Sequence, residues 1–163
     1  MEGVAAGAQT GKAAVYRRWP SKEDLVADAL RSALPGVEEA PNLGSVREDL
    51  LALCRQARQA MFSRPGFALR AVIHECDSMQ VERFQAVIVE GVVEPMIKLL
   101  GVVIGRGIER GEVRPGAANG YVYDAIPAMM MYRNKMCASE WSDQDIEEMV
   151  DLLMLPLPRP NGA

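Results

Sequence analysis

The sequence is poor in the residues that most enzymes use for acid–base and nucleophilic catalysis. It contains a single histidine, His74, which removes most general-base mechanisms. It shows no glycine-rich phosphate loop, no pair of carboxylates in apolar surroundings, and no Ser/His/Asp or Cys/His arrangement. The sequence therefore argues against an enzyme, and we expect no catalytic residues and no cofactor.

Cysteine is also scarce. The three cysteines are odd in number and widely spaced: Cys54, Cys76 and Cys137. This usage favours a reduced, cytoplasmic setting over a disulfide framework. No spacing typical of zinc ligands occurs, so we expect no metal site.

Long apolar runs are absent as well. The most apolar stretch, 87–104, is interrupted by charged residues and a proline: Glu90, Glu94, Pro95 and Lys98. A membrane-spanning helix needs about 20 predominantly apolar residues, so we expect no such helix, no signal peptide and no membrane partner. The hydrophobic content of 49% over 163 residues is nevertheless enough for a substantial core.

One basic segment stands out against the net charge of −4. Four cations occur with no acid among them: Lys12, Arg17, Arg18 and Lys22. Tyr16 and Trp19 are interleaved with these cations. Local positive charge in an otherwise acidic chain suits a specific reader of a polyanion better than a protein that coats nucleic acid.

The basic segment also has the pattern of a helix-turn-helix unit. A run of small residues at 4–8 and an interruption at 9–11 precede a helical pattern at 12–18. Val15 and Trp19 are four residues apart and should face inward. The outward face is then Lys12, Ala13, Tyr16 and Arg17, where an inserted helix meets base edges and phosphates.

Ser21 is predicted to cap a further helix over 22–34. Pro20 disfavours helical backbone at the residue before it, and two acids follow Ser21 in the first turn. The start of this helix, together with Lys22 and Tyr16, could hold a phosphate. A base contact is expected from Lys12 or Arg17, whereas Tyr16, Arg18 and Lys22 would position the DNA backbone.

The run GKAAVYRRWPSKEDLVADAL resembles the recognition helix and following helix of the tetracycline-repressor (TetR) family of one-component transcriptional regulators. The resemblance covers about the first fifth of the chain. It implies that Tyr16 and Lys22 are phosphate contacts. It also implies that Gly11, Lys12 and Ala13 begin the recognition helix.

Two features depart from the family pattern. Gln9 occupies a turn position where the family usually has glycine, so a left-handed backbone there would be mildly strained. The family's first helix is missing from these residues. We therefore expect residues 1–34 to be an incomplete DNA-binding domain followed by a connecting helix.

Beyond a Pro- and Gly-rich boundary at 35–44, the pattern predicts an all-α bundle. The expected helices cover 45–63, 67–76, 79–110, 119–138 and 142–155, with no strand. Ser45 and Ser142 should cap the first and the last of them. Pro95 should kink or break the third of these near 91–94, and Pro127 should bend the fourth. The resemblance implies that residues 35–163 form a ligand-binding and dimerisation domain.

The resemblance further implies an effector pocket in the bundle and a dimer interface on its last two helices. Helix faces give seven apolar pocket candidates, any of which could instead be core: Phe62, Phe67, Leu69, Met96, Leu100, Tyr123 and Met130. Arg70 and His74 share a face and could line the pocket as polar groups, although His74 could equally be exposed or locally bonded. Methionines and one tryptophan suit either an interface or a core: Met129, Met130, Met131, Met136 and Trp141.

Two hypotheses follow. The first is a homodimeric, ligand-responsive regulator, most often a repressor in the resembled family, that binds a palindromic operator in double-stranded DNA and an unknown small-molecule effector. The alternative is an α-helical binding or adaptor protein with no specific DNA recognition, whose basic segment binds an acidic protein or is unused.

Overall fold

The computed structural model describes residues 2–34, 39–75, 84–137 and 141–156, without the side chains of 72–75, 135 and 137. In these residues it contains helices and no strand, which confirms the all-α prediction. The elements in chain order are α1 (Glu2–Gly7), α2 (Lys12–Arg18), α3 (Lys22–Ala33), α4 (Val46–Met61), α5 (Arg64–Glu75), the π-helical turn η1 (Val89–Val93), α7 (Glu94–Glu109), the 3₁₀ turn η2 (Pro115–Ala117), α8 (Gly120–Cys137), α9 (Asp143–Met149) and the π-helical turn η3 (Val150–Met154). Residues 84–88 are helical and lead directly into η1.

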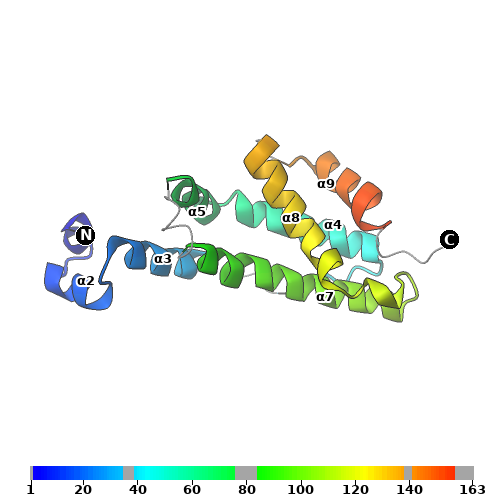
Figure 1. Ribbon diagram of the computed structural model, residues 1–163, viewed down its shortest axis with the longest axis horizontal. Helices are drawn as coiled ribbons and strands as arrows, with labels where there is room; N and C mark the ends of the chain where they lie inside the picture. Colours follow the sequence, from blue (N-terminus) through cyan, green and yellow to red (C-terminus); the bar gives the residue numbers. More distant parts are fainter. Residues whose placement is uncertain (1, 35–38, 76–83, 138–140, 157–163) are drawn as a thin grey trace.

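The molecule is elongated, and α1 and α2 lie at one end of it (Figure 1). Helix α3 runs along the long axis, and the helical run from residue 84 through α7 continues in the same direction. Helices α4, α8 and α9 gather over α7 in the other half of the molecule. The small N-terminal unit is thus held away from the bundle.

Helices α1 and α2 pack against each other and form the N-terminal unit. Their buried residues are Ala5 and Val15. The turn between them contains Gln9, whose φ of 49° lies in the left-handed region, as the sequence predicts. Trp19, which was expected to face inward, is half-buried at the end of α2.

Helix α3 begins where the sequence predicts. Ser21 Oγ accepts the N–H of Asp24 at 3.0 Å, and the Asp24 carboxylate accepts the N–H of Ser21 at 3.1 Å. This reciprocal cap satisfies two donors at the helix start. Further along, Ala27 and Leu30 join a small cluster that fastens α3 to the bundle, together with Leu69, Phe84 and Val87.

The main core lies between α4, α7, α8 and α9. Its fully buried side chains include Leu50, Leu53, Val103, Ile104, Ile126 and Ile146. Each such side chain stabilises the fold by roughly 1.5–3 kcal/mol relative to exposure. The predicted serine caps hold two of these helices, because Ser45 accepts the N–H of Glu48 at 3.2 Å and Ser142 accepts that of Asp145 at 3.1 Å.

A charged network fixes the start of α4 to the end of α7. The fully buried Asp49 accepts the Leu43 N–H at 2.6 Å and lies 3.4 Å from the Arg110 guanidinium. Arg110 also pairs with Glu112, whose carboxylate accepts the Val46 N–H at 2.7 Å. Burial opposes the ionisation of Glu112, but the bonds from Val46 and Arg110 outweigh it and hold the pKa of this carboxyl below its usual range.

The helix before Pro95 widens where a kink or break was expected. Proline has no N–H, and its ring crowds the carbonyl four residues earlier, here that of Gly91. In η1 the backbone takes the wider π-helical form, with the Glu94 N–H bonded to the Val89 carbonyl, and the helix then continues as α7. Helix α8 likewise runs through Pro127 without ending.

Trp141 is a core residue, which decides between the interface and core alternatives left open for it. Its side chain is 2% exposed and packs within the main core. The backbone carbonyl of Trp141 accepts a hydrogen bond from Arg58 Nη1 at 2.8 Å. Trp141 has a φ of 54°, and this left-handed backbone turns the chain into α9. The ring is enclosed by its own chain and is therefore not available to a second subunit.

Candidate nucleic-acid interface and cavity

Helix α2 presents a polar face to solvent. Lys12, Ala13, Tyr16 and Arg17 are exposed, as the sequence predicts, and Val15 on the opposite side is buried. Tyr16 is 43% exposed although it is aromatic. Gly11, at the start of the helix, is exposed and has open space around it. The seven-residue helix therefore offers a short, accessible surface with a fixed orientation.

Lys12 has an acidic partner that the sequence pattern did not reveal. Its Nζ lies 2.5 Å from Glu2 Oε1 of α1 and 5.9 Å from the centre of the Tyr16 ring. Both charged side chains are largely exposed, and ion pairs of this kind contribute little. Lys12 can therefore replace its ion pair with Glu2 by a contact to DNA at a small cost in free energy.

Asp28 connects α2 to α3, a role that the sequence pattern did not indicate either. Its Oδ2 accepts the Trp19 indole N–H at 2.9 Å and lies 4.0 Å from the Arg18 guanidinium. Arg18 in turn lies 4.8 Å from the centre of the Trp19 ring. No local spacing rule connects residues nine positions apart, so only the folded chain brings Asp28 to this site.

Arg17 and Lys22 are exposed cations with no acidic partner among the described residues. Lys22 is the first residue of α3, where the helix dipole favours anions. The capping box already uses the N–H groups of Ser21 and Asp24. A phosphate at this helix start would therefore depend on the Lys22 side chain.

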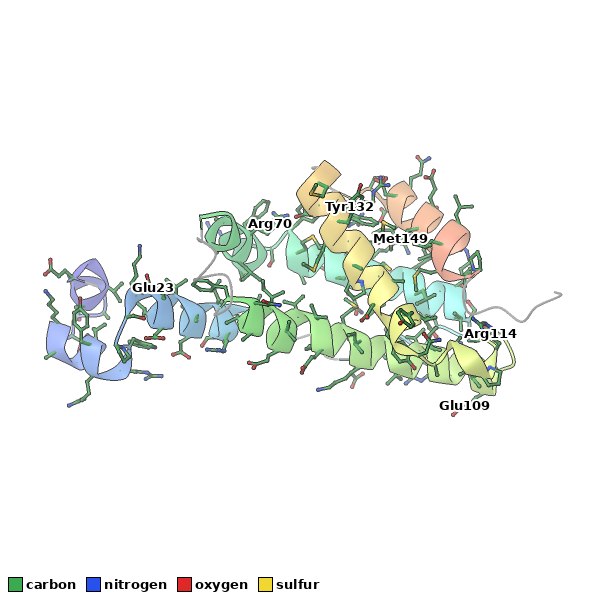
Figure 2. All side chains as sticks on the ribbon, viewed as in Figure 1. Glu23, Arg70, Glu109, Arg114, Tyr132 and Met149 are labelled. Atoms are coloured by element: carbon green, nitrogen blue, oxygen red, sulfur yellow. The ribbon has the colours of Figure 1, made fainter. Side chains whose placement is uncertain are left out.

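A second feature is a partly open cavity of about 220 Å³ bordered by the end of α3, α4, α5, η1, α7 and α8. Its wall is apolar except for Arg70 and Asn134. The lining residues are Leu34, Ala57, Ala60, Met61, Gly66, Leu69, Arg70, Ile88, Gly91, Val92, Val93, Met96, Pro127, Met130, Met131 and Asn134. In Figure 2 the labelled Arg70 lies on α5, on the side towards α8.

The structure brings together four of the pocket candidates. Leu69, Arg70, Met96 and Met130 line the cavity. The remaining described candidates lie elsewhere: Phe62 and Phe67 border an open hollow of about 740 Å³ near Trp141, and Leu100 and Tyr123 pack in the main core. The side chain of His74 lies outside the described residues.

Leu34 and Gly91 are cavity residues that the sequence did not indicate. From the sequence, Leu34 was assigned to the connecting helix, and Gly91 to the kink or break expected before Pro95. The π-helical turn changes which residues of its helix face inward, so a regular helical period could not place Val92 and Val93 in the wall. No sequence signal would have identified them.

The described residues show no candidate metal site, and their one described cysteine is not exposed. They contain no cluster of three His, Cys, Asp or Glu side chains that could hold a metal ion. Cys54 is fully buried, and burial raises the pKa of its thiol to about 12, so it stays protonated at neutral pH. Within the described ranges, no helix combines the length and apolar content needed to cross a membrane.

Comparisons with known families cover both parts of the chain. Residues 1–29 match the family described as bacterial regulatory proteins, tetR family, and residues 40–153 match the family described as tetracyclin repressor-like, C-terminal domain. The second match alone spans more than half of the chain.

Individual bacterial proteins are similar over nearly the whole length. An uncharacterized HTH-type transcriptional regulator of Mycobacterium tuberculosis is 31% identical over 170 residues, which cover 99% of this chain and 79% of the relative. The DNA-binding transcriptional repressor TetR of Mycobacteroides abscessus is 27% identical over 167 residues, covering 99% of this chain and 84% of the relative. An uncharacterized HTH-type transcriptional regulator of Bacillus subtilis is 21% identical over 152 residues, covering 92% and 75%.

Proposed function

This chain belongs to the tetR family of bacterial regulatory proteins and is a DNA-binding transcriptional regulator, and we propose that it is a homodimeric repressor released from a palindromic operator by a small molecule. We assign DNA binding to residues 1–34, including the connecting helix α3, and ligand binding and dimerisation to 35–163. The protein would act in the cytoplasm, where a bacterial chromosome is reached.

The exposed face of α2 is the observation that carries this proposal. In the proposed complex α2 enters the major groove, and Lys12 or Arg17 contacts a base edge. Tyr16, Arg18 and Lys22 contact the DNA backbone. Gly11 and Ala13 are small and exposed, which permits close approach to the groove wall. The support is that these side chains are accessible while Val15 fixes the helix from behind.

A dimer would use apolar side chains that α8 and η3 leave in solvent. Tyr132 is 58% exposed, Met136 69% and Leu152 76%. Large apolar groups at this exposure suit an interface with a second copy. Of the other candidate interface methionines, Met129 and Met130 pack inward and Met131 reaches both the surface and the cavity.

The effector would act through the wall that the cavity shares with α3. Leu34 directly follows α3 and lines the cavity, so a ligand there contacts the helix that carries the DNA-binding unit. A ligand shifts the equilibrium only by its difference in affinity between the two states. A tenfold loss of operator binding needs about 1.4 kcal/mol of such coupling.

Selection of random DNA duplexes with the full chain at near-physiological salt, followed by sequencing, tests the proposal. We expect a two-fold symmetric consensus with half-sites about one helical turn apart or a multiple of that. Absence of enrichment by folded protein would overturn the DNA-reading role of α2.

A charge-matched pair of variants assigns the consensus to α2. Arg17→Ala should relax base preference at one position of each half-site, at a cost of about 1–3 kcal/mol for the preferred base. Arg31→Ala removes the same charge from the exposed last turn of α3 and should leave the consensus unchanged. The same change in both variants would show that Arg17 acts only through net charge.

A further inference from the structure

The cavity combines an apolar wall with one cation. Its side chains include the methionines Met61, Met96, Met130 and Met131, and its polar members are Arg70 and Asn134. Methionine adapts its shape to varied apolar groups. A few polar groups in an apolar pocket normally fix the orientation of the ligand. The chemistry of Arg70 therefore decides what the cavity binds.

Unlike Arg55, Arg58 and Arg133, Arg70 has no acidic partner within the described part of the chain. Arg55 and Arg58 both pair with Asp143, and Arg133 pairs with Asp145. Arg70 is half-buried, yet its contacts are with aromatic rings.

Two phenylalanines hold the Arg70 guanidinium in place. Its central carbon lies 4.6 Å from the centre of the Phe62 ring and 4.3 Å from that of Phe67, and the two rings are 6.1 Å apart in an edge-to-face arrangement. Aromatic rings attract a cation, but they do not cancel its charge or satisfy its five N–H donors. The cavity wall therefore includes an oriented cation, and no described residue uses its donors.

We propose that the cavity binds a small hydrophobic carboxylic acid, with the carboxylate on Arg70 and the hydrocarbon part among the methionines. This inference rests on the proposed role of the cavity as the effector site. A guanidinium binds a carboxylate through two parallel hydrogen bonds, which gives both strength and orientation. Asn134, on α8, adds an amide that can donate to the same group.

The size of the cavity limits the acid. A dry cavity of about 150 Å³ accepts benzene, and this one is about 220 Å³. Scaling from the six carbon atoms of benzene gives a ligand of about nine non-hydrogen atoms. Octanoate and phenylacetate, with about ten such atoms each, are close to this size, and they represent a straight-chain and an aromatic source of the same carboxylate chemistry.

The first experiment compares acids with a neutral amide of the same shape on the unmodified full chain. Calorimetric titration at pH 7.5 should show binding of octanoate, phenylacetate or both, and octanamide should bind at least tenfold more weakly than octanoate. The acid that binds more tightly shows whether the cavity prefers a straight chain or an aromatic ring. Binding of octanamide as tight as that of octanoate, or no binding of either acid to folded protein, would overturn the assignment.

Variants of Arg70 then locate the carboxylate. Arg70→Gln should weaken octanoate binding at least tenfold and abolish the preference over octanamide, whereas Arg70→Lys should retain part of it. Arg64→Gln removes an exposed charge from the same helix and should change neither affinity. Unchanged octanoate binding by a folded Arg70→Gln variant would overturn the role of Arg70.

Operator binding, measured in parallel, separates this inference from the proposed function. Release of the operator by the acid but not by the amide supports both. Release by a neutral compound but by neither acid, with no binding of the acids, would overturn the acid assignment and keep the regulator. Tight, Arg70-dependent binding of an acid without release would support the ligand class and overturn the effector role.

Discussion

Leu34 lies directly against Gly91: a Cβ atom added at Gly91 would be 2.8 Å from Leu34 Cδ1. Leu34 ends the helix that carries the DNA-binding unit, and Gly91 lies in the π-helical turn of the bundle. Both residues line the cavity. This contact is therefore where the cavity, the bundle and the connecting helix meet.

Replacement of Gly91 by Ala should disturb the connecting helix without touching the DNA-binding face. Two carbon atoms cannot lie 2.8 Å apart, so the Leu34 side chain must turn away from the new methyl group, which alters how the residue after α3 packs on the bundle. We expect operator affinity, measured by fluorescence anisotropy, to fall by on the order of tenfold, or about 1.4 kcal/mol.

A double substitution tests whether the effect passes through Leu34. Leu34→Ala in the Gly91→Ala background should restore most of the lost affinity, because the shortened side chain removes the clash. Gly101→Ala is the control, since an added Cβ there meets no atom within 4 Å. Equal affinities for the single and double variants would show that Leu34 does not transmit the change.

Asp28 should stabilise the docking of α2 on α3. Asp28→Ala removes the acceptor of the Trp19 indole and the partner of Arg18, at a cost of about 1 kcal/mol of local stability. Asp28→Asn keeps an oxygen acceptor and should lose less. Faster amide hydrogen exchange across 12–18 reports the opening. Equal protection in both variants and the native chain would contradict the role of Asp28.

Lys22 should act on DNA as a phosphate contact. Lys22→Ala is expected to weaken binding to all duplexes alike and to reduce the slope of log affinity against log salt by about 0.9 per protomer. Lys98→Ala removes another exposed lysine, from α7, and should leave the slope unchanged. If the two lysine variants give the same slope, Lys22 makes no phosphate contact.

Glycine at position 9 should stabilise the turn between α1 and α2. Gln9 has a φ of 49°, which is unfavourable for a residue with a Cβ atom. Gln9→Gly relieves this strain but gains freedom in the unfolded chain, so the net increase in stability should be about 0.5 kcal/mol. Gln9→Ala keeps the strain. Thermal unfolding that ranks Ala above Gly would contradict the strained turn.

The bundle should lose stability in acid, partly because two aspartates at the start of α9 become protonated. Arg58 and Arg55 lower the pKa of Asp143, and the Ser142 cap lowers that of Asp145. Because the folded-state pKa values lie below the ordinary value of about 3.9, this stabilisation is complete above that pH and is lost as the pH falls below it. Thermal unfolding from pH 6 to pH 2.5 measures the loss.

Asp143→Asn separates this contribution from that of the other carboxylates. The variant cannot gain stability from ionisation at this position, so its melting temperature should fall less steeply with acid than that of the native chain. Parallel curves for the two proteins would mean that Asp143 does not contribute to the acid dependence.

Features set by neighbouring residues could be predicted from the sequence. The caps at Ser21, Ser45 and Ser142 depend on side chains within three positions, and all three form as expected. The irregular turn before Pro95 was placed correctly because proline always removes a backbone donor. Local chemistry was sufficient in each case.

The start of α5 shows the limit of such local rules. Pro65 was expected to precede the helix, whereas α5 begins at Arg64 and accommodates the proline in its first turn, where no N–H is needed. Gly66 permits this corner, because a Cβ there would lie 2.3 Å from the Met61 carbonyl oxygen. That close approach is visible only once α4 and α5 are packed.

The sequence by itself determined the helical class, the caps and the accessible basic face of α2, because each depends on residues within one or two turns of each other. Tertiary structure alone decided that Asp28 holds Trp19, that Trp141 is core, and that Arg70 reaches the cavity. Helical periodicity shows which face of a helix is apolar. It does not show which other face will cover it, and that pairing creates both the cavity and its contact with α3.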